Sequence, residues 1–503
     1  MNPKFDLKGN YFENSFYLGH ESSFQRITKY SPANTKDLLW ECIVDPHHVD
    51  KVMHSAETGF NLWKKTPLST RISYLKKYQE RVSQRREEVA LAIALETGKP
   101  LWEAHTEVNS VIAKIDITIS DSLELIADKK YEKILPETNG LVHYKPLGIS
   151  LIIGPFNFPC HLANGQILSA LIAGNSIIYK PSEKTIYSAQ LLIECFHQAE
   201  FPLGVINFIN GGGDIVSDFL KEKSVRGVFF TGSKEVGEKI LEKTYKDFSK
   251  LVALEMGGKN TTIIHADALT EPCLYELLKS CFLTTGQRCT ATSKVAIHSS
   301  LKNEFIEKFH ALAKKIIIDH PTQFDIEPFM GPLIDHKSMD NYLLYMGMAK
   351  REGAEEIMRG KHLEKKFEGY YVSPSIHVME KRENKSTFLA SEIFGPNCTF
   401  IPYNDIEEAI QIANMGEYGL AGSVFTKDES IYQKCLENID VGLLNWNRST
   451  VGASAKLPFG GVKSSGNYRP AGSFMISSCA YPVASLQISA PIETIDKPKG
   501  LIE

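Results

Sequence analysis

Hydrophobic and polar positions follow helical spacing through the first part of this chain. Residues 68–95 place apolar side chains at roughly helical intervals among many Arg, Lys and Glu residues, which predicts one long surface helix. Gly98 and Pro100 then supply a stop signal. A second helical pattern covers about 103–127, and residues 141–153 change to an extended pattern.

From residue 149 onward, short apolar strands alternate with helical segments in two series. The first series predicts strands at 149–153, 176–179, 205–209 and 226–231, and helices at 161–172, 185–199, 214–223 and 235–247. The second predicts strands at 261–265, 294–298, 371–376, 398–403 and 423–426, and helices at 271–284, 301–316, 336–352 and 405–414. This alternation is typical of α/β proteins, in which helices cover both faces of a parallel sheet. The last stretch, 474–489, is expected to be extended and to pair with the edge of another chain.

Composition narrows the class of protein further. A chain of 503 residues is long enough for two or three domains. The formal net charge of -4 gives no large basic field that would attract nucleic acid or an anionic membrane. No apolar run reaches the roughly 18 residues of a membrane span, and the N-terminus lacks the apolar segment of a secretory signal. We therefore expect a soluble, cytoplasmic protein.

The cysteines offer one candidate for chemistry. There are nine, and no C-x-x-C pair occurs, so neither a metal site nor a thioredoxin-like motif is predicted. Cys289 lies among small and hydroxylated residues in 284-TTGQRCTATS-293. Such a cysteine is either a buried packing residue or a nucleophile that substrate can reach.

Polar residues follow several of the predicted strands, where ligands bind in parallel sheets. Asn157, in 154-GPFNFPCH-161, either satisfies its own turn or offers its amide to an oxyanion. Glu255, in 252-VALEMGGKN-260, is either salt-bridged or a desolvated base with a raised pKa.

Two further segments suit a nucleotide, and a third carries an acidic and an aromatic residue at a turn. Lys180 and Glu183, in 180-KPSEKT-185, either hold ribose hydroxyls or belong to a helix cap. The turn 232-GSKEVGEK-239 opens a helix, and its free N–H groups would suit a pyrophosphate, although a plain turn is an equal alternative. The segment 392-EIFGPN-397 places a Glu before a Phe and a Gly-Pro turn.

The order of these segments carries more information than any one of them. GPFNFP, KPSE, FTGSKEVG, LEMGGK, GQRCT, EIFGP and LPFGGVKSSG occur in sequence between residues 154 and 466, and together they resemble the aldehyde dehydrogenase superfamily. The resemblance implies an α/β fold with two doubly wound parallel-sheet domains and a small β oligomerisation element. It implies an NAD-binding domain at 1–127 and 148–258, a catalytic domain at 259–450, and a hairpin at 128–147 that joins a tail at 470–503 in a homodimer or homotetramer.

The resemblance also implies NAD as cofactor. Lys180 and Glu183 would hold the adenine-side ribose, and Glu183 would favour NAD because it repels a 2′-phosphate. Glu392 and Phe394 would hold the nicotinamide ribose. The pyrophosphate turn would comprise Gly232, Ser233, Lys234, Glu235, Val236 and Gly237.

For catalysis, the resemblance implies Cys289 as nucleophile and Glu255 as the base that activates water for thioester hydrolysis. The Asn157 amide and the Cys289 backbone N–H would stabilise the oxyanion. Arg288 is expected to be structural. A catalytically silent scaffold would lack one of these residues, and a cysteine hydrolase would need a partnered histidine that no motif supplies.

Within the superfamily, 463-KSSGNYRPAGSFMISSCAYPVASLQ-487 is similar to the enzymes that oxidise N-succinylglutamate 5-semialdehyde. That resemblance implies a small anionic aldehyde as substrate, with Arg448 and Arg469 as cationic anchors. The alternative interpretation of both is as ordinary surface or interface arginines. Glutamate and succinate semialdehydes remain alternative substrates.

Overall fold

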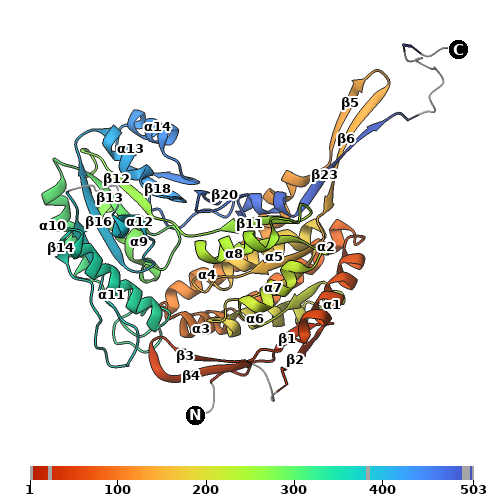
Figure 1. Cartoon of the computed structure of the whole chain (residues 1–503), viewed down its shortest axis with the longest axis horizontal. Helices are drawn as coiled ribbons and strands as arrows, with labels where there is room; N and C mark the ends of the chain where they lie inside the picture. The colour runs from red at the N-terminus through yellow and green to blue at the C-terminus, as the bar shows by residue number, and fades with distance from the viewer. Residues whose placement is uncertain (1–3, 21–24, 381–385, 490–498, 501–503) are drawn as a thin grey trace.

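Two seven-stranded sheets form the two lobes of the molecule (Figure 1). The computed structural model describes residues 4–20, 25–380, 386–489 and 499–500. The first sheet has the strand order β11-β10-β7-β8-β9-β1-β2. Its parallel strands are β7 (Ile149–Ile153), β8 (Ser176–Lys180), β9 (Ile206–Phe208), β10 (Val225–Thr231) and β11 (Leu251–Glu255), and β1 (Asn10–Phe12) and β2 (Ser15–Tyr17) form an antiparallel edge.

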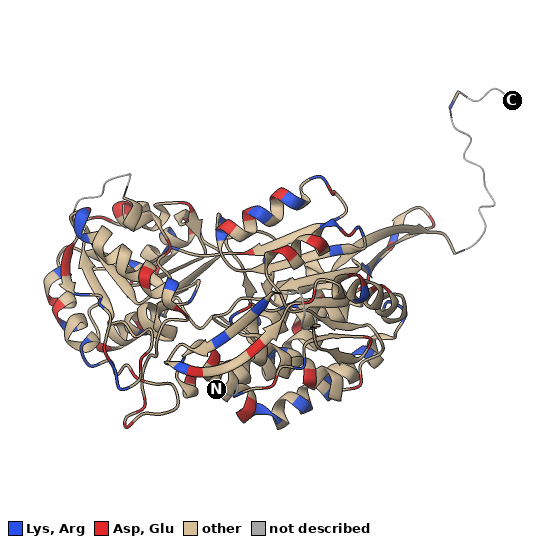
Figure 2. Ribbon diagram, turned by 60° about the horizontal axis from the view of Figure 1, so that its bottom comes forward, with Lys and Arg blue, Asp and Glu red and all other residues tan. Residues whose placement is uncertain are grey.

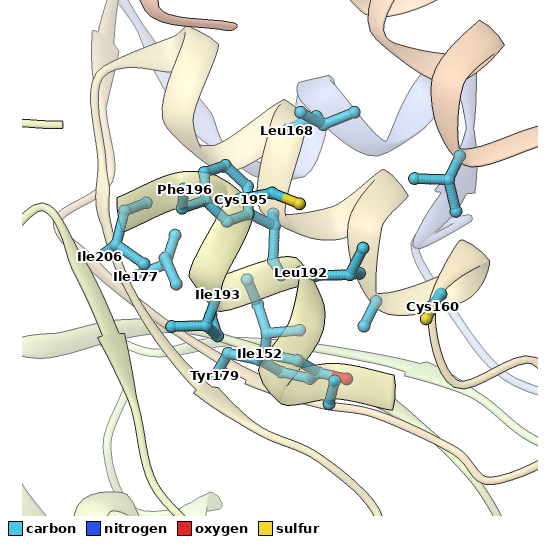
Figure 3. Packing of buried hydrophobic residues seen from close by; sticks show 14 of the residues in the cluster. Ile152, Cys160, Leu168, Ile177, Tyr179, Leu192, Ile193, Cys195, Phe196 and Ile206 are labelled. Atoms are coloured by element: carbon cyan, nitrogen blue, oxygen red, sulfur yellow. The ribbon is translucent and has the colours of Figure 1, made fainter. Parts of the chain in front are cut away.

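Helices cover both faces of the first sheet because its strands are apolar on both sides. They are α1 (His48–Trp63), α2 (Leu68–Gln84), α3 (Arg86–Thr97), α4 (Leu101–Ile117), α5 (His161–Ala173), α6 (Ile186–Gln198), α7 (Gly213–Lys221) and α8 (Lys234–Thr244). Figure 3 shows one face of this core, where Leu192 and Phe196 of α6 lie over Ile152 and Ile177 of the sheet. This packing fixes the loops that leave the strands at their carboxyl ends.

The second sheet has the order β14-β15-β16-β13-β12-β18-β19 and is parallel except for β14. Its strands are β12 (Asn260–Ile264), β13 (Thr292–His298), β14 (Glu355–Met358), β15 (Ser375–Val378), β16 (Asn397–Tyr403), β18 (Ala421–Phe425) and β19 (Leu443–Trp446). Its helices are α9 (Glu271–Phe282), α10 (Lys302–Ala313), α11 (His336–Arg351), α12 (Thr387–Ala390), α13 (Ile406–Asn414) and α14 (Glu429–Asn438). The predicted alternation of strands and helices is thus confirmed in both series.

A three-stranded arm projects from the body (Figure 1). Its strands are β5 (Lys129–Leu135), β6 (Thr138–Pro146) and β23 (Ala480–Gln487). Strand β23 pairs antiparallel with β6 of the same chain, from Ala480 opposite Pro146 to Gln487 opposite Asn139. The expectation that 474–489 is extended is therefore wrong for its first part, because Ser473–Ser478 form a 3₁₀ helix (η4). Its pairing with another chain stays a prediction, since β23 is an edge strand of the arm and β6 occupies one side of it.

Three other predictions differ from the structure in detail. The predicted helix over 68–95 is two helices, because the backbone of Arg85 leaves helical geometry at φ −104° and ψ 18°. The strand predicted at 371–376 begins only at Ser375, since Pro374 has no N–H to donate to a ladder. The helix predicted over 103–127 ends at Ile117 and continues as a π turn, η1 (Thr118–Ser122), and a 3₁₀ turn, η2 (Leu123–Ile126).

The sequence patterns gave no prediction for the first 60 residues. There the structure adds helix α1 and a hairpin of β3 (Arg26–Ser31) and β4 (Asn34–Ile43). Figure 2 shows Lys and Arg interspersed with Asp and Glu over both lobes, in line with the small net charge of -4. Among the described residues, no helix is long and apolar enough to cross a membrane.

Candidate active site

The candidate residues gather where the carboxyl ends of the first sheet meet the amino ends of the second. Ile153 lies level with Lys180, and Thr231 lies level with Glu255, so these parallel strands end at one edge. From the second sheet, the loops that precede β12, β13 and β16 approach this edge. Two hydrogen bonds join the loops: the Asn157 amide donates to the Gln287 carbonyl at 2.9 Å, and the Gly258 N–H donates to the Glu392 carboxylate at 2.9 Å.

Cys289 lies in the loop before β13. All nine cysteines belong to the described residues, and eight are buried while Cys289 is partly accessible. Its carbonyl accepts a hydrogen bond of 2.7 Å from the Asn260 side chain, which holds the loop. Burial raises the pKa of the Cys289 thiol, the charges of Glu255 and Glu392 raise it further, and Arg288 opposes them. The thiol is therefore protonated in this conformation, and a base is needed to release the thiolate.

Asn157 lies in the loop after β7 and is nearly buried. Its side-chain N–H donates to the carbonyl of Gln287, two positions before Cys289 in sequence. That bond uses one of the two N–H groups of the carboxamide, so the other is left for a substrate oxygen. Its own backbone carbonyl accepts a 2.7 Å hydrogen bond from the Lys99 ammonium. The amide is therefore fixed next to the loop of Cys289.

Glu255 ends β11 and is 1% exposed. Both of its carboxylate oxygens are buried, and neither has a hydrogen-bond partner among the residues that the structure describes. Burial raises the pKa of Glu255 well above its ordinary value, and the charge of Arg469 opposes this effect. A buried carboxylate without partners is costly to ionise, and this cost makes it a stronger base near neutral pH.

Lys180 is the last residue of β8, and Glu183 follows the strand. The Lys180 ammonium lies 3.3 Å from a Glu183 oxygen. Burial lowers the pKa of Lys180, whereas Glu183 is half-exposed. The buried Lys180 ammonium at the strand end thus holds the Glu183 carboxylate, which faces solvent.

The turn after β10 opens helix α8. The Ser233 hydroxyl accepts from the Val236 N–H and caps the helix. Lys234 pairs with Glu417, and Glu235 pairs with Lys239 at 2.6 Å. A Cβ at Gly237 would come within 2.4 Å of the Met256 sulfur, so only glycine lets the turn pack this closely.

Glu392 and Phe394 lie in the loop before β16. Burial raises the pKa of Glu392 to about 7, and the Gly258 N–H and Lys259 oppose the shift. Phe394 has a left-handed backbone (φ 53°) and packs edge-on against Phe156 at 5.8 Å between ring centroids. Both side chains line a small pocket together with Gly258, Gly286, Arg288, Ala291, Thr292, Ser293, Ile393, Gly395 and Asn397.

The two candidate anchor arginines have different surroundings. Arg469 donates to the Gly461 carbonyl at 2.8 Å, and its charge acts on Glu255. Arg448 is exposed after β19, and its charge acts on Glu276. The structure therefore brings Arg469 to Glu255, whereas the charge of Arg448 acts on a different carboxylate.

The sequence patterns assigned no functional role to four ionisable residues that lie near the site. They are Lys99, Glu103, Glu107 and Arg288, and all four make ion pairs in or beside the catalytic loops. The segment 96-ETGKPLWEAHTEV-108 carried a signal, because Glu103 and Glu107 lie four positions apart and so share one helix face. Charges on a helix face that is also apolar are a sign of buried ion pairs.

Comparisons with known proteins agree with this geometry. The family model described as "Aldehyde dehydrogenase family" matches residues 19–482. An N-succinylglutamate 5-semialdehyde dehydrogenase of Legionella pneumophila (strain Corby) is 36% identical over 499 residues, which cover 98% of each chain. A protein of the same name from Novosphingobium aromaticivorans is 37% identical over 470 residues, which cover 93% of this chain and 98% of the relative.

Solved structures of aldehyde dehydrogenases also resemble this chain, at lower sequence identity. The betaine aldehyde dehydrogenase of Staphylococcus aureus, in complex with NAD+, superposes with a TM-score of 0.90 at 26% identity, covering 98% of this chain and 97% of that chain. A 1-pyrroline-5-carboxylate dehydrogenase from Thermus with bound NAD reaches a TM-score of 0.87 at 26% identity and covers 95% and 92%. By the family match, the shared fold and the convergence of its motifs on one site, the chain belongs to the aldehyde dehydrogenase family.

Proposed function

We propose that this chain uses NAD to oxidise an aldehyde to a carboxylic acid through a thioester on Cys289. One observation carries the proposal. An accessible cysteine, a fixed carboxamide and an unpartnered buried carboxylate occur together at the meeting edge of the two sheets. These groups supply a nucleophile, an oxyanion donor and a base, which acyl chemistry on a thiol requires.

The chemistry begins with addition of the Cys289 sulfur to the aldehyde carbon. The thiol proton passes to a base, and Glu255 suits this role because its raised pKa lets it hold a proton near neutral pH. The Asn157 amide and the Cys289 N–H donate to the oxygen that becomes negative. When bound, NAD accepts the hydride that leaves this carbon. Once Glu255 has released the thiol proton to solvent, its carboxylate takes a proton from water. The water oxygen bonds to the thioester carbon while the C–S bond breaks, so that the Cys289 thiolate leaves and the acid is released.

The residues present fit NAD. The α8 N-terminus directs free N–H groups and the positive end of a helix dipole toward the strand edge, which suits a pyrophosphate. Lys180 and Glu183 would hold the adenine-side ribose, and Glu392 and Phe394 the nicotinamide ribose. The domains follow from this assignment, with NAD binding at 1–127 and 148–258 and the nucleophile in 259–450.

The mechanism is tested by following NADH formation by absorbance with the purified protein, NAD and an aldehyde. We expect Cys289→Ser to abolish turnover while NAD still binds, because a hydroxyl is a much weaker nucleophile than a thiolate. Asn157→Ala should lower kcat about 100-fold through loss of one oxyanion donor. Turnover by Cys289→Ser at the wild-type rate would overturn the assignment of the nucleophile.

For the substrate, we propose N-succinylglutamate 5-semialdehyde, whose oxidation gives N-succinylglutamate in arginine breakdown through succinylated intermediates. The names of the two relatives at 36% and 37% identity support this choice. The substrate's carboxylates need cationic partners, and Arg448 and Arg469 are the proposed anchors.

The substrate proposal needs a direct comparison of three aldehydes. The values of kcat/KM should be measured for N-succinylglutamate, glutamate and succinate semialdehydes under the same conditions. A clear preference for the succinylated aldehyde supports the proposal. A preference for either of the others keeps the chemistry and replaces the substrate.

We further propose that the arm formed by β5, β6 and β23 joins copies of this chain in a homodimer or homotetramer. Every residue of β5 is exposed, and apolar side chains on the arm face solvent. These are Tyr131, Ile134, Leu135, Tyr481 and Leu486. Residues 490–498 and 501–503 of the predicted oligomerisation tail lie outside the described residues. Light scattering on the wild type and on Leu135→Asp would test the arm, since a charge there should shift the mass toward the monomer.

A further inference from the structure

Helix α4 carries two buried glutamates one turn apart that have no assigned role in the reaction. Glu103 is 1% exposed and Glu107 is 2% exposed. A buried carboxylate is strongly unfavourable unless it is paired and hydrogen-bonded. Each of these two is paired, and each with a different loop of the active site.

Glu107 holds the loop that carries Asn157. Its Oε2 lies 2.7 Å from the Lys99 ammonium, which also donates to the Asn157 carbonyl at 2.7 Å. Its Oε1 accepts from the backbone N–H groups of Cys160 at 2.9 Å and His161 at 3.1 Å. The ion pair therefore fixes both ends of the segment 157–161.

Glu103 holds the loop that carries Cys289. Its Oε1 lies 2.6 Å from the Arg288 guanidinium and also accepts from the Thr284 hydroxyl. The Arg288 Nε donates to the Thr284 Oγ1 at 2.7 Å. Thr284 and Thr285 have φ values of 56° and 55°, a left-handed conformation that β-branched residues rarely adopt. Such strain persists only where neighbouring contacts hold it, and Glu103 supplies two of them.

Phe158 connects the two ion pairs. The Lys99 ammonium lies 3.8 Å from the centroid of its ring, and the Arg288 guanidinium carbon lies 4.8 Å from it. The ring is therefore in contact with one cation from each pair, and cations over an aromatic face are attracted to it. A shift of either loop would change both contacts.

We propose that Glu103, Glu107 and Lys99 are positioning residues, through which helix α4 sets the distance between the Cys289 thiol and the Asn157 amide. The inference rests on the proposed roles of Cys289 and Asn157. In the addition step, the Cys289 sulfur must reach the aldehyde carbon while the Asn157 amide donates to the aldehyde oxygen. Fixing both loops to one rigid helix meets this requirement before substrate arrives.

Different substitutions test the Asn157 loop and the Cys289 loop one at a time. Lys99→Met releases the Asn157 loop, so the pre-steady-state burst of NADH should slow about 10- to 100-fold. The rate at which iodoacetamide alkylates Cys289 in the protein without cofactor should stay unchanged, because that reaction uses no oxyanion donor. Glu103→Gln releases the nucleophile loop and should change both rates. Lys99→Arg keeps the charge and should recover part of the burst rate.

Two variants guard against a purely structural effect. Asp116 also lies on α4 and forms an exposed ion pair with Lys76 of α2. Asp116→Asn breaks this pair and should leave both rates at wild-type values. Phe158→Leu keeps both ion pairs but removes the ring between them, and it should slow the burst without lowering the thermal midpoint much.

The possible outcomes separate this inference from the proposed function. Normal burst rates in folded Lys99→Met and Phe158→Leu, together with a slow burst in Asn157→Ala, overturn the positioning role and leave the function intact. An active Cys289→Ser variant would remove the function itself. Equal losses of burst and alkylation in every variant would indicate general damage to the fold and would also contradict the proposal.

Discussion

The side chains of Arg469 and Glu255 approach each other across Gly460. A Cβ at Gly460 would lie 3.0 Å from the Arg469 Cδ and 3.3 Å from a Glu255 oxygen, so a side chain at that position would separate the two groups. Tyr468 and Arg469 both have left-handed backbones at φ 52°, and this strained pair directs the arginine toward the carboxylate. Within the described part of the chain, the charge of Arg469 thus acts on the proposed base, whose carboxylate has no hydrogen-bond partner there.

This relationship predicts a pH dependence. Glu255 acts as a base only when ionised, so kcat should fall as the pH drops through its raised pKa. Arg469 favours the ionised form, and Arg469→Met should therefore move the acid limb of the kcat profile to higher pH. At a fixed pH on that limb, kcat should be about tenfold lower for each whole unit by which the pKa of Glu255 rises.

Arg448→Met is the matched control, because its charge acts on Glu276 instead. It should leave the acid limb in place, even where KM for an anionic aldehyde rises. If both variants give the same acid limb as the wild type, Arg469 does not act on the base. A rise in KM confined to Arg469→Met would then support substrate anchoring alone.

Glu255→Gln should separate the two halves of the reaction. The amide cannot take a proton from water, so thioester hydrolysis should slow about 100-fold or more. Reduction of the first equivalent of NAD should still be visible as a burst if the thiolate forms without Glu255. A burst lost together with turnover assigns the thiol proton to Glu255 as well. Steady-state turnover at the wild-type rate would mean that another group is the base.

Glu183 should decide between the two nicotinamide cofactors. Its half-exposed carboxylate would repel a 2′-phosphate, so Glu183→Gln should raise the ratio of kcat/KM for NADP to that for NAD about tenfold. Glu222→Gln, an exposed change near the amino end of β10, should leave the ratio unchanged. An unchanged ratio in Glu183→Gln would separate this residue from cofactor choice.

Glu96 makes a prediction about stability. Its buried carboxylate accepts from the Trp40 indole at 2.6 Å, the Tyr187 N–H at 2.9 Å and the Ser188 N–H at 2.8 Å, which joins β4 to the start of α6. Glu96→Ala leaves two buried donors and one partly buried donor without an acceptor and should lower the free energy of unfolding by about 3 kcal/mol or more. In contrast, Glu88→Ala breaks a partly exposed pair with Arg85 and should cost less than about 1 kcal/mol in urea titrations.

The sequence could predict the part of the site that lies at strand ends. Lys180 and Glu255 end short apolar strands, and Asn157 and Gly232 follow such strands. Parallel strands place such positions at one edge. Cys289 was predictable as a candidate from its small neighbours, but its role came from the order of motifs. Local periodicity and family resemblance were therefore sufficient for these residues.

The supporting contacts could not be predicted in the same way. The Glu103–Arg288 pair joins residues far apart in the sequence, and no local pattern states that a helix in one lobe meets a loop in the other. The break at Arg85 was also missed, because both helices keep the same apolar spacing across it. Similarly, the alternation of apolar and polar residues in 480–487 predicts a strand but does not show which strand it pairs with.

The pairing of β23 with β6 has a consequence for how the protein is made. Strand β6 leaves the ribosome early, whereas the strand that completes the arm is translated only after both sheets. Until then β6 presents an open edge, which is an aggregation hazard in a nascent chain. If copies associate through the arm as proposed, the complete contact surface exists only at the end of translation, so that only chains with both lobes synthesised can assemble through this route.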